Sequence, residues 1–329
     1  MNELQRLAIE CYHGTSAYSE VEANDVIRNM IFEKTAPLPE KKAKYKNWLK
    51  RNGLEVFEII TEMVTAVHNE LTVEAFGSLV EVETCDLGDK KDFIVENDEL
   101  FDVALIATGL KTVHRQRIYD NKVPTTAFKL GVTIYAEMFD FLTGKINWTN
   151  FVDKVALSFN RKVSALVTSE IFGAYAPEAN PNFCVAATTS TVNDKLRDVI
   201  AKVADNTGAP VKILGTKTAL AKVENIGTLY NDDKDDRRNF GYVKVFEGAP
   251  CVELPNYYDK NAGAFDVAND ILIIVPGDEA IVKLCYEGDL EVEEETEGKR
   301  KDRQLEMDME RLVHLAVCVG KTFGMIKIS

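Results

Sequence analysis

The longest helical pattern of the chain covers residues 147–175. Apolar side chains recur there at intervals of three and four residues, which is the spacing of one buried helix face. These positions are Val152, Val155, Phe159, Val163, Leu166, Val167 and Ile171. The segment has no proline, and Asn147 or Asn150 can cap its start. The pattern predicts one helix of about 25 residues, or roughly 37 Å, which is long enough to cross a domain.

Three other segments show a helical period, with apolar residues three and four positions apart and a capping or stop signal at one end. They are residues 25–34, with Asn24 as the cap; 42–69, with a break at Asn52-Gly53; and 191–205, closed by Gly208. We therefore predict short helices on both sides of the long one.

Between residues 79 and 136 apolar positions alternate with polar ones, which is the period of a half-buried strand, and several later segments also look like strands. The predicted strands are 79–85, 93–95, 101–107, 111–119, 128–136, 183–187, 211–214, 242–246, 251–254, 271–275 and 281–286. Those between 79 and 136 form a long charged ribbon, in which Lys111, Arg115 and Arg117 share one face. A ribbon with few core residues is marginally stable alone, so we expect it to lie on another surface.

Two acidic strands are predicted near the C-terminus. Residues 289–297 contain six acidic side chains, and residues 305–310 alternate apolar and acidic positions after a basic turn. In a hairpin, one face would carry Glu291, Glu293, Glu295, Glu306, Asp308 and Glu310. Like charges that face each other across a hairpin repel, so we expect a basic partner from outside the subunit.

Composition favours a protein with a substantial core. The 329 residues allow one large or two ordinary domains, and 46% of them are hydrophobic. No apolar run approaches the roughly 20 residues of a membrane span, and the N-terminus lacks a signal-peptide pattern, so we expect a soluble protein made in the cytosol. The net charge of −14 argues against a general nucleic-acid binder, although a container could still enclose nucleic acid.

The sequence shows no pattern of a catalytic, cofactor or metal site. Six scattered cysteines include no C-x-x-C pair, so we expect reduced and mostly buried thiols. The four histidines are far apart, without the spacing of a metal site. Lys-Thr follows a glycine-containing segment at 215–218 and at 320–322, but neither has the upstream glycine of a phosphate loop.

A highly charged segment, NDDKDDRR, occupies residues 231–238. It lacks the glycine and the distal glutamate of a calcium-binding loop. We therefore predict a solvated loop tip, whose acidic side chains are Asp232, Asp233, Asp235 and Asp236.

Residues 111–175 contain the most specific block of the chain. A strand, KTVHRQRIYD, is followed by KLGVTIYAEMFDFLTGKINWTNFVDKVALSFNRKVSALVTSEIFGAY. This block resembles the return strand of the extended loop and the spine helix of the major capsid proteins of tailed bacteriophages, the Hong Kong 97-like fold. Later segments, VKILGTKTALAKV and GYVKVFEGAPCVELPN, are similar to further parts of that fold. The resemblance runs from about residue 50 to the C-terminus.

The resemblance implies an α+β fold with an N-terminal arm, an extended β-hairpin loop, a peripheral domain with a long spine helix, and an axial domain. The corresponding residues are 1–40 for the arm, 41–78 for peripheral-domain helices, 79–130 for the extended loop, 131–186 for the peripheral domain with the spine helix, 187–262 for the axial domain and 263–329 for the peripheral-domain sheet.

The resemblance also implies a structural protein without enzymatic activity or cofactor. Such a subunit assembles with itself into pentamers and hexamers, which form an icosahedral or prolate shell around double-stranded DNA. The implied location is the virion, after synthesis in the bacterial cytoplasm, with portal, scaffolding and decoration proteins as partners and no sequence-specific DNA contact. Residues 231–238 would then lie near the capsomer centre.

Two alternatives remain open at this point. One is an encapsulin-like nanocompartment, which has the same fold but holds protein cargo. The other, from a different class, is a cytosolic α/β enzyme or binding protein, for which the sequence shows no site.

The two charged faces suggest a contact between subunits. Our hypothesis is that Lys111, Arg115 and Arg117 of one subunit pair with the acidic hairpin of a neighbour. The simpler alternative is that both faces are solvated, because an exposed ion pair contributes only about 0–1 kcal/mol. Repetition over a closed shell would multiply such weak contacts.

Overall fold

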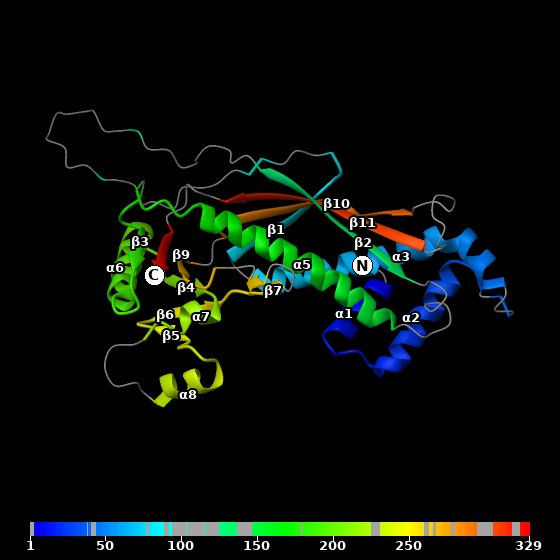
Figure 1. Cartoon of the computed structure of the whole chain (residues 1–329), viewed down its shortest axis with the longest axis horizontal. Coiled ribbons are helices and arrows are strands. Elements are labelled where there is room, and N and C mark those ends of the chain that lie inside the picture. Colours follow the sequence, from blue (N-terminus) through cyan, green and yellow to red (C-terminus); the bar gives the residue numbers. More distant parts are fainter. Residues whose placement is uncertain are drawn as a thin grey trace.

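Most elements pack around a four-stranded sheet and a six-stranded sheet, and the long helix α5 (Trp148–Gly173) runs along much of the molecule (Figure 1). The computed structural model describes residues 3–37, 39–40, 44–76, 79–88, 92–93, 103, 115, 125–136, 147–178, 180–224, 231–259, 263–265, 268–277, 280–294, 305–317 and 323–329. The predicted strands at 101–107 and 111–119 lie outside these residues, apart from single positions.

A four-stranded sheet forms one side of the larger hydrophobic core. In spatial order its strands are β1 (Val80–Cys85), β10 (Val282–Glu294), β11 (Leu305–Val317) and β2 (Thr126–Ala136). β1 runs parallel to β10, whereas β10 with β11 and β11 with β2 are antiparallel. The predicted strands at 79–85, 128–136 and 281–286 are confirmed, and the last of them continues into the acidic segment as one strand.

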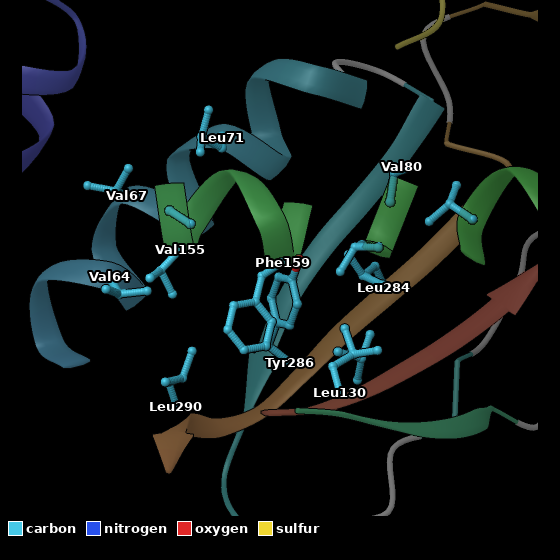
Figure 2. Close-up of a cluster of buried hydrophobic side chains, with 14 of the residues drawn as sticks. Val64, Val67, Leu71, Val80, Leu130, Val155, Phe159, Leu284, Tyr286 and Leu290 are labelled. Atoms are coloured by element: carbon cyan, nitrogen blue, oxygen red, sulfur yellow. The ribbon is translucent and has the colours of Figure 1, made fainter. Parts of the chain in front are cut away.

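The long helix is α5 (Trp148–Gly173), as predicted. Asn147 is its N-cap, and its side-chain oxygen accepts hydrogen bonds from the backbone N–H groups of Thr149, at 3.0 Å, and Asn150, at 3.3 Å. Its apolar stripe packs with the sheet, and Figure 2 shows Phe159 beside Tyr286 of β10. The helix therefore covers the core-facing side of the four-stranded sheet.

A second long helix, α3 (Tyr45–Phe76), also packs on this sheet and on α5. The predicted break at Asn52-Gly53 is wrong, because the helix runs through it. The Asn52 side chain donates a hydrogen bond to the Trp48 carbonyl, 2.9 Å away, and Gly53 is buried. Burial of one face by Phe57, Ile60 and the residues that follow outweighs the cost of about 1 kcal/mol for a helical glycine.

The N-terminal helices α1 (Glu3–Tyr12) and α2 (Glu20–Lys34) pack against α3 and α5. Leu4, Leu7 and Ile31 are buried in the same core as the long helix. Asn24 is not the cap of α2, because the helix already begins at Glu20. Its cap is Ser19, which forms a reciprocal capping box with Glu22.

The second sheet has six strands and is covered by α6 (Val192–Thr207). In spatial order the strands are β3 (Cys184–Ala187), β12 (Gly324–Ile328), β9 (Ile271–Pro276), β4 (Val211–Gly215), β6 (Ala249–Glu253) and β5 (Val245–Phe246). All six residues of β9 are buried: Ile273 contributes to the larger core, and Ile274 to a smaller one under α6. The predicted helix at 191–205 and its Gly208 end are confirmed, but only two residues of the predicted strand at 242–246 pair.

Smaller elements complete the described structure. They are α7 (Lys217–Leu220), α8 (Asn231–Asn239), β7 (Tyr258–Asp259) and β8 (Ala264–Phe265). None of the helices in the described part of the chain combines the length and the apolarity that crossing a membrane requires.

The charged segment at 231–238 is helical, so the predicted loop is wrong. Acidic residues begin α8, and Arg237 and Arg238 occupy its last turn. This order of charges complements the helix dipole, which favours negative groups at the start and positive groups at the end. Arg237 also holds α8 against residues 223–224, because it donates hydrogen bonds to Glu224 and to the Val223 carbonyl, both at 3.1 Å.

Candidate inter-subunit surface

The β10–β11 hairpin brings like charges together, as the sequence predicts. In the strand register Glu291 is opposite Glu310, and Glu293 is opposite Asp308. Glu291 is exposed, whereas Asp308 and Glu310 are half-buried. Directly opposed carboxylates destabilise a strand pair, so this acidic face is a place where a basic group would stabilise the protein.

The structure describes only part of the predicted contact set. Glu306 lies on β11 opposite Tyr135 of β2. Arg115 is exposed. Lys111, Arg117 and Glu295 lie outside the described residues, so the pairing of the basic face with the acidic face stays a prediction.

One side of the acidic face is neutralised within the subunit. Lys129 of β2 forms an ion pair with Glu310, which the sequence did not suggest. The repulsion at Glu310 is therefore relieved from within the subunit, whereas a basic partner from outside stays a prediction for the other carboxylates. The two strands are antiparallel neighbours, and only their register places Lys129 diagonally across from Glu310.

The end of β1 is joined to the sheet at several points. Cys85 and Cys285 form a disulfide with Cα atoms 6.5 Å apart, so the expectation of unpaired thiols is wrong for these two. The N–H of Gly88 donates to Glu287, at 2.6 Å, and Glu287 also pairs with His314. These contacts hold the residues that follow β1 against β10 and β11.

The cysteine pairing could not be read from spacing, because the two residues are 200 positions apart. They meet because β1 and β10 are neighbouring parallel strands. Cys11, Cys184 and Cys251 are free thiols, and Cys184 and Cys251 are buried, as predicted for the cysteines in general.

Hydrogen bonds from His314 and Gly88 lower the pKa of Glu287 below its ordinary value.

A buried cation lies at the centre of the larger core. Arg311 of β11 is 2% exposed; it donates to Nδ1 of His68 and, at 2.8 Å, to Oδ1 of Asn69. Its guanidinium carbon lies 3.8 Å from the centre of the Tyr286 ring. Burial and the nearby guanidinium lower the pKa of His68, so the histidine is neutral and accepts at Nδ1.

Tyr286 extends this buried polar cluster to α3. Thr72 donates to the His68 carbonyl, 2.9 Å away, so its oxygen accepts from the Tyr286 hydroxyl at 2.8 Å. Burial raises the pKa of Tyr286 to about 12. The cluster thus ties α3 to both strands of the hairpin, and it is structural in character.

An acidic cavity of about 590 Å³ lies between α1, α3 and β10. Its lining comprises Gln5, Glu58, Thr61, Glu62, Thr65, Asp289, Leu290 and Glu291. Of these, sequence reasoning identified Glu291 alone. The helical spacing of 58, 61, 62 and 65 indicates a common face, but nothing local shows that this face meets residues 289–291.

A second cavity, of about 420 Å³, lies at the start of α5. Its lining includes Cys11, Ser16, Tyr18, Thr149 and Asp153. Burial raises the pKa of Asp153 to about 6 from an ordinary value of 3.8. The carboxyl therefore opposes folding once it is ionised.

We expect Asp153→Asn to raise the free energy of unfolding at pH 8 by about 1 kcal/mol, with little effect at pH 4. Because the pKa is higher in the folded state, the stability present below pH 3.8 is lost as the pH rises through about 6. The expected gain in the free energy of unfolding is smaller than the full difference in pKa would give, because the Asp153 carboxyl is partly exposed. Denaturant titrations at pH 8 and pH 4 measure the free energy of unfolding of both proteins. Glu170→Gln, on the same helix, is the control. Equal effects of Asp153→Asn at the two pH values would contradict the prediction.

Comparison with solved structures finds similarity to capsids and to a virus-like particle. The capsid of an empty GTA particle has a TM-score of 0.51 at 10% identity, covering 78% of this chain and 89% of that chain. The mature capsid of bacteriophage PhiM1 has a TM-score of 0.49 at 13% identity, covering 77% and 86%. A virus-like particle from Pyrococcus furiosus has a TM-score of 0.46 at 12% identity, covering 81% and 98%. At such identities the likeness concerns the fold alone.

The family comparison is more specific. The family model described as "SPbeta prophage-derived putative capsid protein YonB" matches residues 13–327. The search of curated protein sequences gave no match. The fold is the α+β, Hong Kong 97-like fold of phage major capsid proteins, as the sequence predicted. Because the family model spans almost the whole chain, the protein belongs to the YonB family of prophage-derived capsid proteins, and it is a structural protein rather than an enzyme.

Proposed function

We propose that the protein is the major capsid subunit of a tailed phage, and that it assembles with itself into pentamers and hexamers around double-stranded DNA. The family match over residues 13–327 is the observation that carries this proposal. In addition, the opposed carboxylates of β10 and β11 leave a surface that a basic neighbour would stabilise. The net charge of −14 suits a wall that encloses DNA without binding its sequence.

The proposal includes further partners and positions. Portal and scaffolding proteins, and a decoration protein, are the expected partners in a virion assembled in the bacterial cytoplasm. The acidic start of α8, with Asp232, Asp233, Asp235 and Asp236, is proposed to lie near the capsomer centre, where copies would crowd like charges. Assembly would therefore respond to salt or to divalent cations at that point.

Electron microscopy of the full-length protein tests the proposal most directly. Uniform closed shells or ring-shaped capsomers support it. A protein that remains a stable monomer at high concentration would refute it. The nucleic acid content of shells made in an infected or induced host tests the enclosed DNA separately.

Reversing Arg115 and Arg117 to glutamate is expected to reduce shell formation and to lower the salt concentration at which shells dissociate. Each lost ion pair is worth only about 0–1 kcal/mol, but the loss is repeated at every subunit contact. The measurement is the shell fraction by sedimentation across a salt series.

The control for this experiment reverses two exposed lysines elsewhere, Lys195 and Lys327, which gives the same change in net charge. Shells of the arginine variant with unchanged salt tolerance would show that the basic face does not contact a neighbour.

A further inference from the structure

We propose that the cavity at the start of α5 binds a small primary alkylamine in its protonated, ammonium form. The cavity has a volume of about 420 Å³, which is within the range of small-molecule sites. Its walls come from the turn between α1 and α2 and from the first turns of α5, and Figure 1 shows α1 and α2 beside one end of α5. All of these groups belong to one subunit, so the site does not depend on the proposed function.

Two oxygen atoms of the cavity wall lack hydrogen bonds. Thr149 is 8% exposed, and its buried hydroxyl has no partner among the described residues. Asp153 is half-buried, and its buried Oδ1 likewise has no partner in the described part of the chain. The two residues are four positions apart on α5, so they are neighbours on one face of the helix. A ligand that donates hydrogen bonds would satisfy both oxygens and remove the cost of burying them unpaired.

The charge of the cavity calls for a cation. Burial raises the pKa of Asp153 to about 6, so this carboxyl is still ionised at neutral pH. Among the described residues that line the cavity, none carries a positive charge. A partly buried carboxylate without a cation is unfavourable, and a positively charged ligand would relieve that cost.

An anion or a metal ion fits this cavity less well. The start of a helix can bind an anion through its free N–H groups, but those of Thr149 and Asn150 already donate to Oδ1 of Asn147. The N–H of Phe151 donates to the Asn147 carbonyl, and the carboxylate of Asp153 would repel an anion. No group of three or more His, Cys, Asp and Glu side chains that could hold a metal ion occurs among the described residues.

A primary ammonium group matches the oxygens of the wall. It carries one positive charge and three N–H donors on a compact head. Asp153 and Thr149 can accept two of these hydrogen bonds, and the hydroxyl of Ser16, on the opposite wall, offers a third acceptor. The ring of Tyr18 and the methyl group of Ala23 can cover the alkyl part of the ligand. A bound amine would therefore join the turn at residues 13–19 to α5.

Thermal unfolding of the unassembled full-length chain at pH 8 tests the ligand class. We expect n-butylammonium chloride to raise the unfolding temperature in a saturable way, because a ligand that binds only the folded state stabilises it. Tetramethylammonium chloride at the same ionic strength has the charge without N–H groups, and n-butanol has the alkyl chain without the charge; neither should produce this rise. Equal responses to the three compounds, or no response to any, would overturn the inference and leave a cavity that holds water only.

Variants of the two unpaired groups test the site itself, with calorimetric titration of n-butylammonium as the measurement. We expect Asp153→Asn to weaken binding about tenfold, and Thr149→Val to weaken it about threefold, because the first loses a charged acceptor and the second a neutral one. Asp153→Asn is also expected to be more stable than the wild type at pH 8, so weaker binding cannot result from unfolding. Glu170→Gln, on the same helix but exposed, should bind like the wild type. Wild-type affinity in Asp153→Asn would refute the site.

Hydrogen exchange measured by mass spectrometry locates the bound amine. We expect n-butylammonium to slow amide exchange about threefold in peptides that cover residues 13–19, because the ligand would hold this turn against α5. Peptides from α6, which packs on the other sheet, should exchange at the same rate with and without the amine. Unchanged exchange at residues 13–19, or slower exchange only in other segments, would contradict binding in this cavity.

Discussion

Arg311→Ala is expected to lower the free energy of unfolding by about 3–5 kcal/mol, which is enough to prevent accumulation of folded subunits. The arginine is 2% exposed and donates to His68 and Asn69. Alanine would leave both acceptors unpaired and open a cavity beside the Tyr286 ring. Denaturant unfolding of unassembled subunits measures the loss, with soluble yield as a second readout.

Two further variants identify the cause of the loss in stability. Arg311→Met fills most of the same volume without the charge, and it is expected to cost about 1 kcal/mol, because an apolar replacement also removes the burden of burying a cation. Arg238→Ala, on the exposed end of α8, should be close to neutral. A loss below about 1 kcal/mol for Arg311→Ala would show that the buried cluster does not stabilise the core.

Reducing the disulfide between Cys85 and Cys285 is expected to lower stability by about 2–4 kcal/mol, which is the second-largest effect. The bond closes a sequence separation of 200 residues, so it strongly restricts the unfolded chain. It also holds β1 to β10 next to the Glu287 contacts with Gly88 and His314. Thermal unfolding with and without dithiothreitol measures the difference.

The double variant Cys85→Ser, Cys285→Ser should unfold at the same temperature in both conditions, close to the reduced wild type. Cys11→Ser removes a free thiol and keeps the wild-type response to dithiothreitol. Maleimide labelling of the unfolded, unreduced chain counts the thiols directly. Wild-type protein whose unfolding temperature does not change on reduction would contradict a stabilising disulfide.

Local patterns predicted the elements with a strong apolar period. The stripe of α5 and the shared acidic face of the C-terminal strands follow from spacing that the chain itself carries, and Asn147 was one of the two residues expected to cap α5. The errors came where one local signal was outweighed by packing or by a second local signal. Asn52-Gly53 reads as a turn, but the buried face of α3 keeps the helix continuous. Residues 231–238 read as a loop, but their charges are ordered to favour a helix.

The residues of the candidate inter-subunit surface could be predicted only in part from the sequence. Glu291 and Glu310 were identifiable because alternation along a strand shows which side chains share a face. Glu58 and Glu62 were not, because their meeting with residues 289–291 depends on where α3 crosses the sheet. Arg311 was not predicted to face the core, although it continues the alternation of β11; its partners His68 and Asn69 are more than 240 residues away.

The sequence alone determined the long helix and the acidic strands, because periodicity of apolar side chains is a local property that survives any arrangement of the elements. The class of fold was predicted from the resemblance of residues 111–175 and later segments to phage capsid proteins. Only the tertiary structure decided which distant groups meet: Cys85 with Cys285, Arg311 with His68, Lys129 with Glu310, and the carboxylates of the acidic cavity. Such contacts depend on strand order and helix crossing, which the burial of the whole core selects and no single segment encodes.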